Sequence, residues 1–315
     1  MRGVLSFFID NMDTEKIFEN IGIDGQIAIM RNGLGTVCDG LFHLFYNWRR
    51  SKGENDISES ESEAIAQCIL QIIVCKIRSL LDMSNGINVR PEKDTIRILD
   101  IPSLISVLRS LYEMAFVFHN IYAEPETKEE RDIVLYIWEI RGLNNRQNMP
   151  IVPLAFKEKA EKEKKQIEDL KNRIISIVTN LDMSDEIRKQ LINVASMKTV
   201  EIKGYRFKKD SENNRIIAFE DYRYEEGAEA LLRTDAPTYR FLSIHGHPSY
   251  LGVLQFGQLF HSDTDKEFLR TILTCACKLS STIAIDFREH IDGADDVFSQ
   301  LNEKEKEIII TLHNS

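Results

Sequence analysis

The sequence predicts an all-α protein, a multi-helix bundle with a small β-hairpin insertion. Only 15 Gly and 7 Pro occur in 315 residues, and a low content of these helix-breaking residues disfavours a turn-rich β architecture. Most long segments place apolar residues three and four positions apart, which is the spacing of a helix with one buried face. Two β-rich runs flank a polar turn in residues 199–222, and they predict the hairpin, the one sheet that we expect.

The first helix is predicted over residues 23–50. Its end, residues 41–52, mixes four aromatic residues with three basic ones. Aromatic rings beside cations can stack on and clamp a nucleotide. Cations in the last turn of a helix also compensate its dipole, and we favour this second interpretation.

The remaining helices follow the same apolar spacing, and polar stretches separate them. Residues 51–63 form an acidic loop and residues 84–100 an irregular connection. The helices are predicted at residues 61–83, 101–122, 128–143, 156–181, 185–197, 225–233, 264–291 and 294–313.

The helix at residues 101–122 is the most apolar of the chain, and its apolar residues lie on every side. Such a helix is normally central and buried. Arg109, Glu113 and His119 interrupt it, and buried charges need partners because desolvation is costly. Arg109 and Glu113 are four positions apart and can pair on one face. We interpret them first as a structural ion pair, and second as residues that also reach a site formed by a neighbouring helix.

A polar run followed by Pro150 and Pro153 is the best candidate for a boundary. It divides the chain into an N-terminal helical region, residues 1–150, and a C-terminal helical region, residues 151–315. The two regions could also form one continuous domain.

Composition limits the classes of function. The formal net charge of −10 argues against nonspecific coating of nucleic acid, which needs many Lys and Arg contacts to phosphate, but it leaves a local RNA site open. The five cysteines are odd in number and lie mostly in apolar helical stretches, as in a reduced cytosolic protein.

The apolar run near the amino terminus is too short for a signal peptide, and no window of 18 uninterrupted apolar residues occurs. We therefore expect a cytoplasmic protein that does not interact with membranes.

The chemistry-bearing residues concentrate in residues 235–252. Arg240 precedes His245 and His247 there, among several hydroxyl-bearing residues. Pro237 suits a first helical turn, whereas Gly246 and Pro248 stop a helix from continuing past the histidines. The cluster is therefore predicted to lie where a helix ends, a position at which side chains can converge on a ligand.

Three interpretations of this cluster remain open. Arginine offers a planar fork for phosphate and histidine exchanges protons near neutral pH, which suffices in principle for metal-free RNA cleavage through attack by the neighbouring 2′-hydroxyl. Tyr239 and Ser243 could position the phosphate. In the structural alternative, Arg240 and His247 hold the bundle together by pairing with Glu113 or capping carbonyls. A less favoured alternative is a divalent metal site that draws on Glu113, His245, His247, His261, Asp263 and Asp265.

Two short segments carry a resemblance. Leu-Arg-Ser-Leu-Tyr-Glu at Leu108–Glu113 and Tyr-Arg-Phe-Leu-Ser-Ile-His-Gly-His-Pro-Ser at Tyr239–Ser249 resemble the signatures of a group of uncharacterised bacterial helical proteins. In that group an Arg-Ser-x-x-Glu motif recurs with a later Tyr-x-x-Leu-Ser-x-x-x-His-x-Ser. The second segment is also similar to the Arg-x4-6-His motif of the HEPN (higher eukaryote and prokaryote nucleotide-binding) superfamily.

The resemblance implies a function and a set of site residues. Many HEPN members are metal-independent endoribonucleases of toxin–antitoxin and phage-defence systems, and they act as dimers without a cofactor. When the family motif is matched to this sequence, the resemblance implies that Arg240 is the phosphate-binding residue and His247 the proton-transfer residue. Phe241 departs from the family pattern, which often has Asn, Asp or His at this position. The supporting residues that we expect are Arg109, Glu113, Tyr239, Ser243, His245 and Ser249.

The sequence thus leads to two functional hypotheses. The first is a HEPN-like endoribonuclease or nucleotide-binding effector, with RNA or a nucleotide as ligand, a homodimeric state, and an antitoxin or other protein as partner. The second is a non-catalytic helical interaction or sensor protein with a structural Arg/His/Glu network. Exposure of Arg240 and His247 distinguishes the two, because catalytic side chains must line an open cleft.

Overall fold

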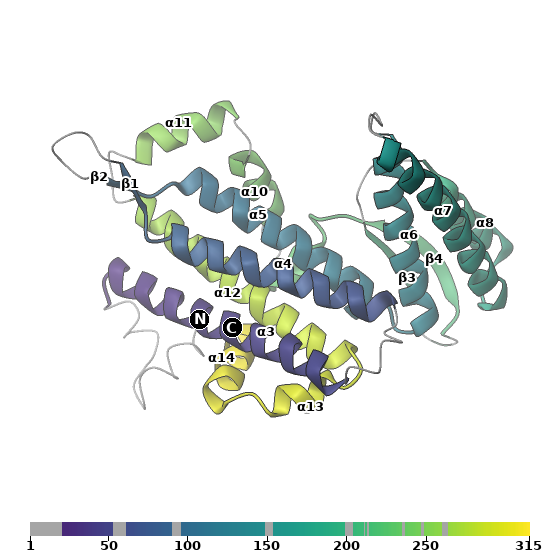
Figure 1. Ribbon diagram of the computed structural model, residues 1–315. Helices are drawn as coiled ribbons and strands as arrows, with labels where there is room; N and C mark the ends of the chain where they lie inside the picture. The colour runs from purple at the N-terminus through teal and green to yellow at the C-terminus, as the bar shows by residue number, and fades with distance from the viewer. Residues whose placement is uncertain are drawn as a thin grey trace. The chain divides into compact units, whose positions relative to one another are not determined.

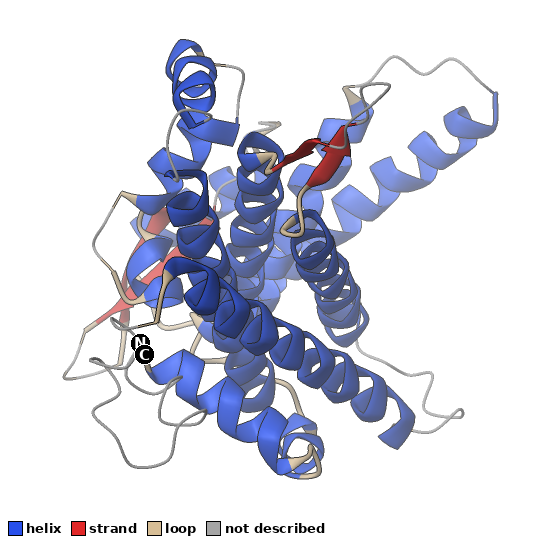
Figure 2. Ribbon diagram, turned by 90° about the vertical axis from the view of Figure 1, so that its left-hand side faces the viewer, coloured by secondary structure: helices blue, strands red, loops and turns tan. Residues whose placement is uncertain are grey.

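The computed structural model describes residues 21–52, 61–89, 96–148, 154–198, 204–210, 212, 214–234, 237–246, 249–259 and 264–315. Within these residues lie 12 α-helices, a π-helical turn and two small two-stranded sheets (Figures 1 and 2), so the all-α prediction is confirmed. Backbone contacts divide the chain into two units. Unit 1 comprises Met1–His119 and Gly227–Ser315, and unit 2 comprises Asn120–Glu226.

The predicted division at residue 150 falls inside unit 2. The polar run before the prolines does end a helix, at Gln147. The helices on either side of the connection nevertheless pack together and share one apolar core. The two helices that flank the prolines therefore belong to one unit.

Unit 1 is built around a helix that follows the prediction closely at its start. The helix α5, Ile101–Phe118, is capped by Asp100, whose side chain accepts a hydrogen bond from the amide of Ser103 at 3.2 Å. It packs against α4, α10 and α12 (Figure 1) and buries Leu104, Leu111 and the large aromatic residues that follow. The elements of unit 1 are α3 Ile23–Ser51, α4 Glu61–Met83, β1 Ile87–Val89, β2 Ile96–Ile98, α5, α9 Gly227–Leu232, α10 Thr238–Gly246, α11 Tyr250–Leu259, α12 Thr264–His290, α13 Ala294–Ser299 and α14 Glu303–Asn314.

The predicted helix 101–122 does not stay α-helical to its end. A π-helical turn, His119–Ala123, follows Phe118 directly. Nδ1 of His119 lies 2.8 Å from a carboxylate oxygen of Asp286 on α12, and both side chains are largely buried. The polar residues that interrupt this apolar helix are thus paired, as burial requires.

Three elements of unit 1 differ from the sequence prediction. Residues 84–100 contain the antiparallel pair β1 and β2, whose three-residue strands are too short to show an alternating pattern. The helix α11 was not predicted, since its two glycines indicate a turn. The predicted helix 294–313 is two helices, α13 and α14, because Asn302 caps a new start by accepting the amide of Glu305 at 2.9 Å.

Unit 2 contains the predicted hairpin. Strands β3 and β4 pair antiparallel from Gly204 with Tyr222 onward, and Tyr205 stacks on Phe219 with ring centroids 5.0 Å apart. Ile133, Ile140 and Ile174 belong to the apolar core that the helices and the hairpin share. The elements of unit 2 are the rest of the π-helical turn, α6 Lys128–Gln147, α7 Leu154–Asn180, α8 Asp185–Ser196, β3 Gly204–Lys209 and β4 Ile216–Tyr222.

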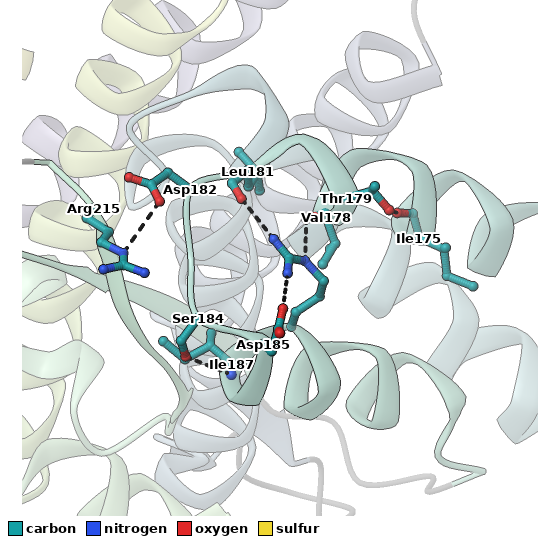
Figure 3. Close-up of polar contacts among 10 residues, drawn as sticks. Ile175, Val178, Thr179, Leu181, Asp182, Ser184, Asp185, Ile187 and Arg215 are labelled. Atoms are coloured by element: carbon teal, nitrogen blue, oxygen red, sulfur yellow. Dashed lines mark hydrogen bonds and ion pairs between the residues drawn. The ribbon is translucent and has the colours of Figure 1, made fainter.

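A polar turn joins α7 to α8 in unit 2 (Figure 3). The guanidinium of Arg188 donates to the carbonyl of Val178 at 3.2 Å and pairs with Asp185 at 2.6 Å. The side chain of Ser184 accepts the amide of Ile187 at 3.3 Å and so caps α8. Carbonyls at the end of one helix and amides at the start of the next are thus satisfied by side chains, which makes a tight connection possible.

The cysteines are less uniformly buried than their sequence context predicts. Cys38 and Cys277 are buried, whereas Cys68 and Cys75 are exposed on α4 and Cys275 is partly buried. The apolar stripe of α4 is narrow enough to leave these two positions outside it.

Among the residues that the structure describes, three helical segments are long and apolar enough to cross a membrane: Glu61–Met83, Ile101–Ala123 and Thr264–His290. The sequence has no long uninterrupted apolar run, but by their length and composition these helices could still span a membrane. In α12 the buried residues include polar ones, Ser280, Ser281 and Asp286.

Candidate functional site

The cluster predicted at a helix end lies on α10 in unit 1. This helix ends at Gly246, as the glycine predicted, and its backbone begins with the amide of Phe241 donating to the carbonyl of Pro237 at 3.0 Å. The hydroxyl of Ser106 on α5 lies 3.3 Å from the carbonyl oxygen of Gly246. A Cβ at Gly246 would lie 3.5 Å from Cδ of Arg109, so the end of α10 runs close over the polar face of α5.

Arg109, Glu113 and Tyr239 form a closed network between α5 and α10. Nε of Arg109 donates to Oε1 of Glu113 at 2.9 Å, and Nη2 donates to the Tyr239 hydroxyl at 3.2 Å. That hydroxyl donates in turn to the same Oε1 of Glu113 at 3.0 Å. The predicted Arg109–Glu113 pair is confirmed, and the neighbouring helix reaches it through Tyr239.

Burial and charge act in opposite directions on this network. Burial by itself would lower the pKa of Arg109, but the hydrogen bond with Tyr239 and the charge of Glu113 raise it on balance. Burial raises the pKa of Tyr239 and the Glu113 charge adds to this effect, against the opposing influence of Arg109. At neutral pH the network therefore holds a charged guanidinium and a protonated phenol.

Arg240 lies apart from this network, on the exposed side of α10. Within the part of the chain that the structure describes, no hydrogen bond or ion pair holds its guanidinium. Ser243 is half-buried one turn further on. His247, the predicted proton-transfer residue, lies outside the described residues.

Ser249 has a local backbone role. Its hydroxyl donates to the carbonyl of Ile244 at 2.8 Å and accepts the amide of Gly252 at 3.0 Å. It thus joins the end of α10 to the first turn of α11. This arrangement explains a serine at the last position of the motif without any contact to a ligand.

His245 lies among aromatic rings. Its ring centroid is 4.4 Å from that of Phe241 and 6.2 Å from that of Phe268 on α12. Burial lowers the pKa of His245, so the imidazole is neutral at physiological pH. A neutral imidazole can accept a proton, but this one is packed as an aromatic side chain.

Half of the six residues named for the metal alternative lie outside the described part of the chain. His247, His261 and Asp263 all lie outside the described residues. Among the described ones, no group of three His, Cys, Asp or Glu side chains is arranged to hold a metal ion. Glu113, a residue of this alternative, pairs with Arg109 and Tyr239.

The structure adds residues that the sequence analysis did not select. The ring of Tyr112 packs against that of Tyr239 with centroids 5.5 Å apart. Ser106 lies three positions before Arg109 on the same face of α5, so helical spacing from Arg109 and Glu113 could have identified it. No local pattern links Phe268 to Phe241, because they are 27 positions apart and only the packing of α12 brings them together.

Comparison with protein-family models, curated proteins and solved structures gives no match to this chain.

Proposed function

We propose that the protein is a HEPN-like, metal-independent endoribonuclease or nucleotide-binding effector, with Arg240 as the phosphate-binding residue and His247 as the proton-transfer residue. The observation that carries the proposal is the contrast between two arginines. Arg109 of α5 pairs with Glu113 and Tyr239 and so holds α10 on α5, whereas Arg240, on α10 itself, is exposed. An exposed guanidinium on an anchored helix is available for bidentate binding of phosphate.

The supporting residues have separate parts in this proposal. Tyr239, Arg109 and Glu113 position α10, and Ser249 links the end of α10 to the first turn of α11. Ser243 and His245, both half-buried on α10, are the remaining polar groups near Arg240 in sequence. Attack by a 2′-hydroxyl on the adjacent phosphorus needs a group that accepts the hydroxyl proton and a cation that stabilises the phosphate charge, which are the roles of His247 and Arg240.

Homodimerisation belongs to the same proposal. The helix α11 follows the His247 segment and exposes Tyr250, Leu251, Val253 and Leu254. It has no charged residue, and four exposed apolar side chains on one short helix support association with a second copy or with an antitoxin-like protein. Sedimentation of the purified chain measures the first of these directly.

The decisive experiment is cleavage of labelled RNA by the purified full chain in EDTA. We expect Arg240→Ala and His247→Ala each to lower the rate by about 100-fold or more, because each removes one half of the chemistry. Arg223→Ala is the matched control, since Arg223 is an exposed arginine in unit 2, and it should cleave like the wild type. Absence of cleavage by folded wild type, with or without divalent ions, would refute the nuclease proposal.

A second candidate function is a non-catalytic interaction or sensor protein. The observation that favours it is that the Arg-Ser-x-x-Glu motif and the tyrosine of the second motif bind one another. Motif residues that satisfy one another can be explained by stability alone. Wild-type protein that binds no RNA but captures a partner protein through α11 would support this second function.

A further inference from the structure

Unit 1 contains an apolar pocket beside the candidate site. It has a volume of about 250 Å³ and opens to solvent. Its walls come from three helices: Leu108 of α5, Phe241 and Leu242 of α10, and Phe268, Ile272 and Cys275 of α12. Concave, mostly apolar sites between helices are the kind of place where small molecules bind.

The aromatic residues give the pocket a defined shape. The rings of Phe241 and Phe268 are nearly parallel, with an interplanar angle of 21° and centroids 6.1 Å apart. His245 packs on the Phe241 ring at 4.4 Å and supports it from the side. Leu108, on α5, is almost wholly buried, and α10 is held on α5 by Tyr239. The pocket is therefore bounded by side chains whose positions are set by packing.

The polar atoms near the pocket do not offer charge or strong hydrogen bonds. The hydroxyl of Thr271, which also lines the pocket, donates to the carbonyl of Glu267 within α12 at 3.0 Å. Burial raises the pKa of the Cys275 thiol to about 11, so this sulfur is uncharged at neutral pH. Among the described residues that line the pocket, none carries a formal charge. A charged ligand would lose its hydration there without compensation.

We propose that this pocket binds a small, uncharged, mainly apolar molecule of one or two rings. An apolar cavity of about 150 Å³ accepts benzene, so the larger space here suits one ring with substituents or a bicyclic system. The parallel Phe241 and Phe268 rings favour a flat ligand through offset stacking. The proposal does not depend on ribonuclease activity, because it uses neither Arg240 nor His247.

The test uses indole as the probe, titrated into the full chain and followed by calorimetry. We expect saturable binding, and much weaker binding of indole-3-carboxylate, which has the same ring system with a charge. Cys275→Phe should fill the pocket and weaken indole binding by at least about tenfold. Cys68→Phe is the matched control, because Cys68 is exposed on α4, and its affinity should equal that of the wild type.

A second measurement needs no folded variant. Alkylation of wild-type cysteines by N-ethylmaleimide is followed by mass spectrometry with and without saturating indole. We expect indole to slow modification of Cys275 by at least about fivefold, because a bound ring covers the thiol, and to leave the exposed Cys68 and Cys75 unchanged. The proposal is overturned if indole does not bind saturably or if it does not protect Cys275. It is also overturned if indole binding is lost in Leu251→Ser, on the exposed surface of α11, and retained in Cys275→Phe.

Discussion

Tyr239 connects the two sequence motifs, because its hydroxyl binds both Arg109 and Glu113. We expect Tyr239→Phe to keep the ring contact with Tyr112 and to lower the free energy of unfolding by about 1 kcal/mol, the usual net value of such hydrogen bonds at a partly exposed site. Urea denaturation measures this change. Tyr250→Phe, at a residue that is 80% exposed, should be neutral, and equal effects of the two substitutions would contradict a stabilising network.

The titration of another single residue, His245, makes the free energy of unfolding depend on pH. Burial lowers its pKa below the ordinary value of 6.5, so in the window just below 6.5 the unfolded chain binds a proton that the folded chain does not. Stability must then fall as the pH falls through 6.5 towards the lowered pKa. His313 shifts in the same direction, through burial and the nearby charge of Arg233.

The expected result is a smaller pH dependence after substitution. The loss of unfolding free energy between about pH 7.5 and about pH 5.5 should be smaller in His245→Gln than in the wild type, because glutamine does not titrate. Urea denaturation at both pH values tests this. A loss of the same size in both proteins would show that the folded imidazole titrates normally.

Among the elements, two helical glycines have opposite surroundings. A Cβ at Gly227, the first residue of α9, would lie 2.5 Å from the ring of Phe116, which is buried in the core of unit 1. We expect Gly227→Ala to cost about 1–3 kcal/mol through this overlap. A Cβ at Gly35 in α3 would meet nothing within 4 Å, so Gly35→Ala should stabilise by about 0.5–1 kcal/mol. Thermal unfolding of both variants would show opposite shifts, and two shifts of the same sign would contradict this packing.

The start of α14 depends on a single side chain. Asn302 accepts the amide of Glu305 at 2.9 Å, and Glu305 in turn lies 2.8 Å from the ring of His43 on α3. We expect Asn302→Ala to lower the free energy of unfolding by about 1 kcal/mol. Asn302→Asp should be close to neutral, because it also caps and places a negative charge at the helix start. A neutral alanine variant in urea denaturation would argue against a separate helix at Glu303.

For the whole molecule, the three apolar helices raise the question of location. In unit 1 the helices α5 and α12 pack against each other and bury Leu104, Leu279 and Phe287. Apolar faces that are buried in this way need no lipid, and α4, of whose apolar window 33% is buried, also packs against α3 and α5. We therefore expect the full chain to remain in the supernatant after high-speed centrifugation of a detergent-free lysate, and recovery in a pellet that only detergent dissolves would instead support a membrane protein.

Element type could be predicted from the chain because it follows from local spacing. The helix at Glu61–Met83 and the hairpin around β3 and β4 agree with the prediction, since apolar periodicity is visible within a short window. The pairing of Arg109 with Glu113 was predictable for the same reason, because four positions are one helical turn. The end of α10 at Gly246 followed from the glycine itself.

The tertiary structure decided what lies next to these elements. Unit 1 combines two segments that are far apart in the chain, one ending at residue 119 and the other starting at residue 227. Tyr239 reaches Glu113, and Phe241 faces Phe268, only because α5 and α12 both pack near α10. The apolar residues Leu251 and Val253 of α11 are exposed, although their residue types are typical of a core. Contacts between distant segments depend on how helices pack, and a periodic pattern specifies that a face is apolar without specifying its neighbour.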